Sequence, residues 1–138
     1  MSVWATLQAR KRLFSAFKTG DICRKVGDRM LYPAIKRVEL ADNYTRYTVR
    51  LPVGLDPSVL SDKLYVFQQI LGPHVVIDGD IRYFTITVYR KGLPSKVAYK
   101  FTDWQTLADR MALPVIVGRD HNNEPVAFDL AEYPHVLI

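Results

Sequence analysis

The sequence predicts an α+β fold: an N-terminal helix, then a mixed or antiparallel sheet of β-β-α-β-β order, then further short C-terminal strands. Three observations predict it. Apolar residues recur at helical spacing near the N-terminus and again over residues 57–71. Polar and apolar residues alternate in runs that lie at hairpin distances from one another. A length of 138 residues with 49% hydrophobic content suits one domain with a real core and excludes a disordered chain.

Residues 2–18 are expected to form the first helix. Its apolar face is predicted to carry Val3, Leu7, Phe14 and Phe17, with Leu13 at the edge. Gly20 ends this segment, and residues 21–30 are interpreted as one more short helical turn. The Tyr32-Pro33 step then stops any helix, because the residue before a proline disfavours helical geometry.

The central part of the chain predicts two hairpins separated by a helix. Strands are expected at 34–40 and 44–51, and again at 74–78 and 81–90 around a turn at Gly79-Asp80. Between the two hairpins a single helix is predicted over 57–71. Asp56 serves as its N-cap, Pro57 occupies its first position, and Gly72-Pro73 ends it.

Shorter elements are predicted in the last third of the chain. They are a strand at 96–101, a short helix capped by Asp103 and running to about Arg110, and strands at 114–118, 125–129 and 135–138. The apolar ending His135-Val136-Leu137-Ile138 lacks a polar tail, which predicts a strand that continues into a further part of a longer protein.

Positive charge is concentrated near the N-terminus. The net charge is +5, yet residues 1–37 contain nine Lys or Arg and two acids, so the rest of the chain is slightly acidic. A basic segment of this kind indicates contact with nucleic acid or with anionic lipid. The candidate DNA-binding residues are Arg10, Lys11, Arg12, Arg24 and Lys25. A merely solvated helix face is the alternative that the sequence leaves open.

The sequence contains no pattern typical of a catalytic or metal site. His74, His121 and His135 have no metal-ligand spacing, and the lone Cys23 excludes a disulfide framework within the chain. No serine lies in a nucleophile motif, and no GxxxxGK[ST] or GxGxxG loop occurs. No catalytic residue, no metal ligand and no cofactor are therefore predicted for this chain, and no stretch is apolar enough to span a membrane.

Aromatic and basic residues interleave in Arg82-Tyr83-Phe84, Tyr89-Arg90-Lys91 and Tyr99-Lys100. On a sheet face this pattern fits a platform on which bases stack. It also fits amphipathic strands with snorkelling cations, which is the interpretation favoured by the sequence.

The last 25 residues resemble the FtsK/SpoIIIE family of DNA translocases. The family pattern runs LGKD, a few residues, G-x-P-V, an Asp-Leu pair and P-H-L-L-[IV], directly before the P-loop AGxTGSGKS. Its counterparts here are Gly118-Arg119-Asp120, Glu124-Pro125-Val126, Asp129-Leu130 and Pro134-His135-Val136-Leu137-Ile138. Arg119 stands where lysine is usual, and Asn123 where glycine is usual. Residues 30–112 look like the segment before the motor in members from conjugative plasmids and integrative elements.

The resemblance implies three segments: a basic helical segment 1–32, an α+β domain 33–112, and the start of a motor domain at 113–138. Residues Pro134 to Ile138 are then the strand that enters the Walker A loop. This chain is expected to be non-catalytic, whereas the parent protein is expected to bind ATP and Mg²⁺ and to hydrolyse ATP.

The same resemblance implies the partners and the location. They are double-stranded DNA, further copies of the parent in a hexameric ring, and membrane-proximal or transfer-apparatus proteins, in the cytoplasm or at the cytoplasmic face of the membrane. The expected process is plasmid or conjugative transfer, or chromosome segregation. The alternative is a stand-alone adaptor that binds protein or nucleic acid, and a third interpretation is a small hydrolase using a histidine and a carboxylate.

Overall fold

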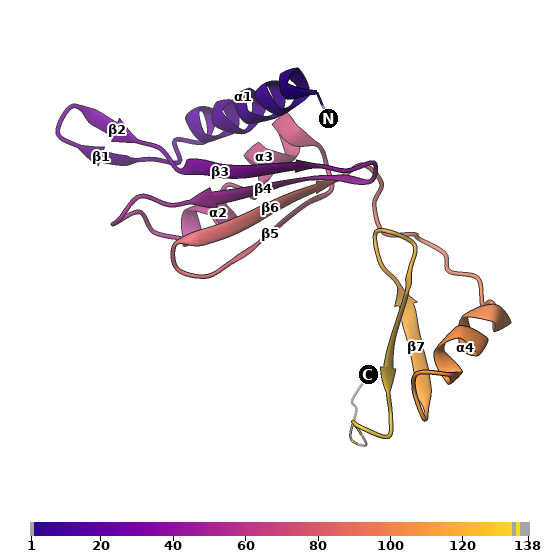
Figure 1. Ribbon diagram of the computed structural model, residues 1–138. Coiled ribbons are helices and arrows are strands. Elements are labelled where there is room, and N and C mark those ends of the chain that lie inside the picture. Colours follow the sequence, from indigo (N-terminus) through magenta and orange to yellow (C-terminus); the bar gives the residue numbers. More distant parts are fainter. Residues whose placement is uncertain (1, 134, 136–138) are drawn as a thin grey trace. The chain divides into compact units, whose positions relative to one another are not determined.

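The structure is a computed structural model that describes residues 2–133 and 135. It confirms the α+β class, with an N-terminal helix, antiparallel strands and short C-terminal strands. The chain divides into two compact units, Met1–Arg90 and Lys91–Ile138 (Figure 1). The segment boundaries that the resemblance implies, after residues 32 and 112, stay a prediction. The strand predicted at 135–138 lies outside the described residues, apart from His135.

A four-stranded antiparallel sheet forms the centre of the first unit. Its strands are β3 (Ala34–Leu40), β4 (Tyr44–Arg50), β5 (Val75–Gly79) and β6 (Tyr83–Tyr89), in the spatial order β3-β4-β6-β5. All four coincide with the predicted strands to within two residues. The first hairpin is closed by a hydrogen bond of 2.9 Å from the Ala41 N–H to the Tyr44 carbonyl.

Three helices pack on one face of this sheet. They are α1 (Val3–Thr19), α2 (Ser58–Asp62) and α3 (Leu64–Leu71), and Figure 1 shows α2 and α3 behind the strands. The core joins Leu13 and Phe17 of α1 to Phe67 of α3 and to the inward residues of the sheet. The Phe17 and Phe67 rings meet edge to face, with centroids 5.9 Å apart.

Helix α1 is confirmed, and its predicted apolar face is right at Phe17 but wrong at Val3, Leu7 and Phe14. The buried residues are Ala9, Leu13, Ala16 and Phe17, at the spacing i, i+4, i+7 and i+8. Val3 and Leu7 are exposed instead. The reason is steric: the two alanines let α1 lie close to the sheet, and a hydrophobicity pattern gives such small side chains little weight.

The single helix predicted over 57–71 is also wrong in one respect, because Lys63 interrupts it with φ −101° and ψ 19°. The first part contains Ser61 and Asp62, whose side chains favour turns over helix interiors. Helix α2 has Pro57 at its N-cap, one residue after the predicted cap, and the neighbouring Asp56 Oδ1 accepts a hydrogen bond of 2.9 Å from the Ser58 N–H.

The helical turn predicted at 21–30 is a β-hairpin. Strand β1 (Arg24–Val26) pairs with β2 (Arg29–Leu31), and Gly27 supplies the left-handed residue of the turn with φ 60°. We call residues 24–31 the basic ribbon, because every residue of both strands is exposed and three of them are cations. Figure 1 shows the ribbon at the edge of the first unit.

The second unit consists of α4 (Phe101–Ala108) and a hairpin of β7 (Pro114–Arg119) and β8 (Pro125–Asp129). Both strands were predicted. The strand predicted at 96–101 is wrong: residues 96–100 form no regular structure, and Phe101 begins the helix. An alternating pattern alone does not make a strand without a partner to complete its ladder.

Asp103 lies in the first turn of α4 and is not its cap, and the helix ends at Ala108, two residues before the predicted end. Among the described residues, no helix is long and apolar enough to cross a membrane.

Candidate nucleic-acid interface

The second face of the four-stranded sheet carries no described helix of the first unit, since all three helices contribute to the core on the opposite face. Alternate residues of the two central strands lie on this uncovered face. The cross-strand pairs are Tyr44 with Tyr89, Arg46 with Thr87, Thr48 with Thr85, and Arg50 with Tyr83, and of these residues Thr87 is buried by its neighbours. Strand β3 adds Arg37 and Glu39, and strand β5 adds Val76 and Asp78. We call this set the open sheet face.

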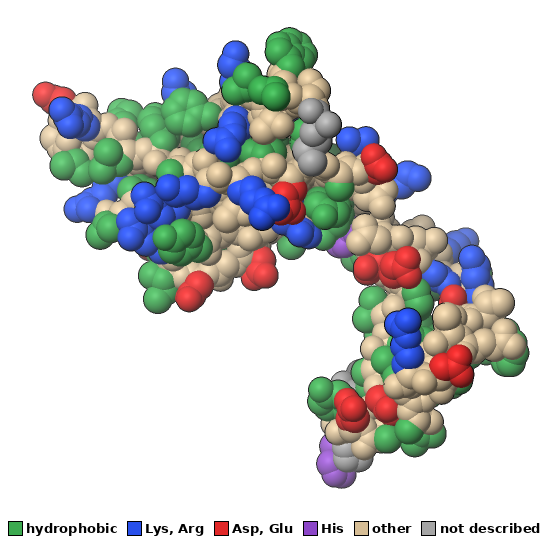
Figure 2. Space-filling view, viewed as in Figure 1, with side chains coloured by type: hydrophobic (Ala, Val, Ile, Leu, Met, Phe, Trp, Pro, Cys, Tyr) green, Lys and Arg blue, Asp and Glu red, His purple; other side chains and the backbone are tan. Residues whose placement is uncertain are grey.

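Charges on the open sheet face are mixed, with arginine in excess. Glu39 forms ion pairs with Arg37 at 3.0 Å and with Arg46 at 3.7 Å. Arg50 takes part in no ion pair with any described residue. Figure 2 shows Lys and Arg side chains gathered over the sheet of the first unit, with few acidic ones among them.

Tyrosines lie at both ends of this face. Tyr83 is 57% exposed and sits across the strand pair from Arg50. At the other end the Tyr44 and Tyr89 rings meet edge to face, with centroids 6.2 Å apart. The Arg46 guanidinium carbon lies 4.6 Å from the centre of the Tyr44 ring, a cation–π contact.

The sequence favoured ordinary amphipathic strands for the interleaved aromatic and basic residues. In the structure some of these residues contact the rest of the first unit, and others lie on the open sheet face. Phe84 is buried in the core, and the Arg82 Nε donates a hydrogen bond of 3.2 Å to the Leu51 carbonyl. Tyr83 and Tyr89 lie on the open sheet face. The alternation along β4 and β6 was visible in the sequence, but the register that places Arg50 beside Tyr83 was not.

Two of the predicted DNA-binding residues hold the N-terminal helix in place. Arg10 Nη1 donates a hydrogen bond of 3.1 Å to the Ile35 carbonyl, and Arg12 Nη2 donates one of 2.8 Å to the Ile70 carbonyl. A cation at the last turn of α3 also suits the negative end of that helix. Burial raises the pKa of the Tyr47 phenol, and the Arg12 charge partly opposes this rise. Lys11, between the two arginines, is exposed.

The other two predicted residues, Arg24 and Lys25, lie on the basic ribbon. Arg24 donates a hydrogen bond from Nη1 to the Val53 carbonyl. Its guanidinium packs against Gly54, where an added Cβ would lie 2.6 Å from the Arg24 Cζ. Lys25 and Arg29 are exposed, and neither forms an ion pair with a described residue. The sequence did not single out Arg29.

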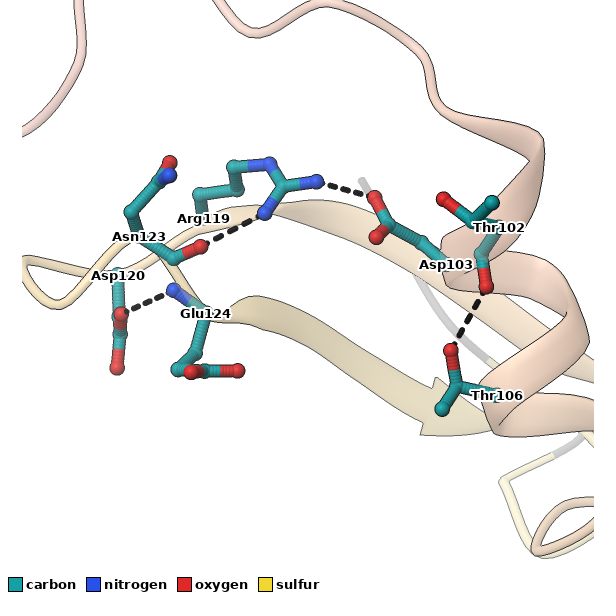
Figure 3. A network of polar contacts seen from close by, with 7 residues as sticks. All are labelled: Thr102, Asp103, Thr106, Arg119, Asp120, Asn123 and Glu124. Carbon is teal, nitrogen blue, oxygen red and sulfur yellow. Dashed lines mark hydrogen bonds and ion pairs between the residues drawn. The ribbon is translucent and has the colours of Figure 1, made fainter.

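A polar network connects α4 with the β7–β8 hairpin in the second unit (Figure 3). Arg119 forms an ion pair with Asp103 and donates a hydrogen bond of 2.7 Å to the Asn123 carbonyl. Asp120 Oδ1 accepts a hydrogen bond of 2.9 Å from the Glu124 N–H. Asn123 has φ 65°, a conformation that glycine adopts most easily.

Asp129 stabilises the end of the hairpin at which β7 begins and β8 ends. Its carboxylate accepts hydrogen bonds from the N–H groups of Ala112, Leu113 and Ala131, at 2.9, 3.0 and 3.0 Å. These donors stabilise the charged form, so the pKa of Asp129 lies below its usual value. The side chains of the resemblance motif that the structure describes thus stabilise the hairpin.

The described residues contain no group of three His, Cys, Asp or Glu side chains that could hold a metal ion. His74 and His135 are exposed, and Cys23 is a partly buried free thiol. Of the predicted strand before the Walker A loop, Pro134, Val136, Leu137 and Ile138 lie outside the described residues.

No protein-family model matches the chain, and no curated protein matches it either.

Proposed function

We propose that this chain is the non-catalytic N-terminal domain of an FtsK/SpoIIIE-like, ATP-dependent double-stranded DNA translocase. The observation that carries the proposal is the conformation of Asn123. The family pattern has glycine at this position, and Asn123 adopts the left-handed conformation, φ 65°, that favours glycine. Asparagine is among the residues that tolerate this conformation best. The departure from the pattern therefore stands at a position whose backbone conformation also suits glycine.

The exposed apolar side chains of the second unit also support the proposal. Among the described residues of this unit, only Pro114 is buried. An apolar pocket of about 370 Å³ opens between α4 and the hairpin, lined by Trp104, Ala108, Met111, Leu113 and Leu130 among others. A surface of this kind is expected where further parts of a motor domain pack.

The motif by which the FtsK/SpoIIIE family binds ATP and Mg²⁺ is a P-loop. A P-loop needs backbone N–H groups in a glycine-rich turn, a lysine on the phosphates and a Ser or Thr on the magnesium. The sequence has no such motif. ATP binding and hydrolysis, and the hexameric ring, are therefore proposed for the parent protein, working in the cytoplasm or at the cytoplasmic face of the membrane.

Contact with duplex DNA is proposed for the basic ribbon together with Lys11. A two-stranded ribbon fits the major groove, and Lys25 and Arg29 are exposed cations on it. Arg10 and Arg12 are poor choices for mutation, because their removal would also break the hydrogen bonds that hold α1. The exposed pair Lys25 and Arg29 tests the contact without that complication.

We expect Lys25→Ala/Arg29→Ala to weaken binding of a labelled duplex and to flatten its salt dependence. Each lost phosphate contact removes about 0.9 from the slope of log K against log salt, so two contacts remove about 1.8. The matched control is Lys96→Ala/Lys100→Ala, which removes the same charge from exposed positions of the second unit. An unchanged slope in the ribbon variant, measured by fluorescence anisotropy, would show that the ribbon is only a solvated surface.

The alternative, a stand-alone adaptor, is favoured by the completeness of the first unit. The core cluster of buried residues lies entirely between Ala9 and Ile86. A unit with its own core can serve as a binding module whatever follows it in the chain.

A further inference from the structure

We propose that the open sheet face binds single-stranded nucleic acid. The sugar-phosphate backbone would lie along Arg37, Arg46 and Arg50, and bases would stack on Tyr83 and on the Tyr44–Tyr89 pair. This inference goes beyond the proposed function, because it concerns a different surface and a different form of nucleic acid from the duplex contact of the ribbon.

The chemistry of the face favours nucleic acid over a protein partner. Stable protein interfaces have an apolar centre from which charged residues are depleted. Here the centre of the two middle strands carries Thr48, Thr85 and Arg46. Threonine hydroxyls both donate and accept hydrogen bonds, as the edges of bases require.

The arginines that contact the Glu39 carboxylate can bind a phosphate in its place. Arg37 and Arg46 share the single carboxylate of Glu39, with the Arg37 side chain 73% exposed. Exposed ion pairs are weak, so a phosphate can replace Glu39 at little cost. Arg50, which has no ion pair with a described residue, needs no exchange at all.

The aromatic side chains define the length of the site. Tyr83 and Tyr89 are the first and last residues of β6, so roughly 20 Å of extended strand separates them. Arginines and threonines lie between these ends. A strand of several nucleotides can therefore reach both aromatic ends while its phosphates pass the arginines.

The geometry selects unpaired strands. Stacking on tyrosine requires bases that are free of a duplex, and base–aromatic stacking is tolerant of sequence. A four-stranded sheet is too broad for the major groove, which admits a helix or a two-stranded ribbon. DNA and RNA offer the same phosphate and base chemistry, so the two are separated by experiment.

The test is fluorescence anisotropy with the full chain and labelled oligothymidine or oligouridine of about 16 nucleotides, at about 50 and 200 mM salt. A labelled duplex of the same length serves as competitor. We expect Tyr83→Ala to weaken single-strand binding about tenfold, and Tyr83→Phe to bind like the wild type. Arg50→Ala should lower the salt slope by about 0.7, the value for one phosphate of a single strand.

A variant that is expected to bind single-stranded nucleic acid more tightly gives a sharper test of the proposal. Glu39→Gln removes the carboxylate that occupies Arg37 and Arg46, so we expect binding to tighten about two- to fivefold. The matched control is Glu132→Gln, which removes one exposed acid from the second unit and is expected to change nothing. A general effect of net charge would move both variants equally.

Three results would overturn the proposal: no binding of either oligonucleotide, a preference for the duplex, or unchanged binding in Tyr83→Ala and Arg50→Ala with circular dichroism intact. Tighter binding of oligouridine than of oligothymidine would support it with RNA as the ligand, and the reverse order with DNA. The ribbon variant Lys25→Ala/Arg29→Ala is expected to keep its single-strand affinity, so failure here is distinguishable from failure of the duplex contact.

Discussion

Asn123 stands where the family pattern has glycine, and its backbone adopts a conformation that suits glycine. Its φ of 65° costs a β-branched residue far more than it costs glycine. We expect Asn123→Gly to leave the stability of the hairpin within about 0.5 kcal/mol of the wild type, and Asn123→Val to lower it by about 1–2 kcal/mol. Amide hydrogen exchange of β7 and β8 measures the difference, and equal protection in both variants would contradict the account.

Asp129 predicts a pH dependence of the second unit. Its pKa is lower in the folded protein than its ordinary value of about 3.9, because three N–H groups donate to the carboxylate. The stabilisation is therefore fully present above the ordinary value and is lost as the pH falls through the lower, folded value.

We expect the amides of Ala112, Leu113 and Ala131 to lose protection over that acidic range. Asp129→Asn should show weak protection at every pH, since a neutral amide oxygen is a poorer acceptor. Nuclear magnetic resonance measures the exchange protection of these amides at several pH values. Protection in the wild type that persists far below the ordinary pKa would contradict this role.

At the scale of elements, the N-terminal helix offers the clearest test of the core. Phe17 is fully buried and meets Phe67, whereas Leu7 of the same helix is 52% exposed. We expect Phe17→Ala to lower the free energy of unfolding by about 3–5 kcal/mol, and Leu7→Ala to change it by less than about 0.5 kcal/mol. Urea denaturation followed by helical circular dichroism measures both, and a loss in Leu7→Ala as large as that in Phe17→Ala would support the face that the sequence predicted, on which both residues lie.

The strands were predictable because strict alternation has one physical meaning, a sheet with one buried face. Residues 44–50 show this alternation, with Tyr47 and Val49 buried. Residues 34–40 alternate less strictly, because a bulge interrupts the strand between Ile35 and Arg37, yet both strands formed where expected. The basic ribbon was not predictable in this way, since both of its strands are exposed and no buried face imposes alternation. Its turn residues, Gly27-Asp28, lie inside the segment 21–30 that the sequence assigns to a helical turn.

Part of the candidate interface was also predictable. Concentrated positive charge at the N-terminus drew attention to Arg24 and Lys25, which lie on the ribbon. It gave equal weight to Arg10 and Arg12, because a sequence does not reveal which guanidinium groups are used by nearby carbonyls. The open sheet face depends on register between strands far apart in the chain, which composition does not encode.

For the whole molecule, the two units differ in how they are stabilised. The first unit has a continuous core built from helices and sheet. The second depends on the Arg119–Asp103 ion pair, the Asp129 carboxylate and a short hairpin, with large apolar side chains such as Tyr99 and Phe101 exposed.

The most direct test of the proposed function is the sequence of the source gene over about twenty codons after that for Ile138, the length in which a P-loop motif is recognisable. We predict a strand end followed by a glycine-rich loop that finishes in Gly-Lys-Ser or Gly-Lys-Thr. A stop codon directly after Ile138 would contradict the translocase account and leave the stand-alone adaptor as the function of this chain.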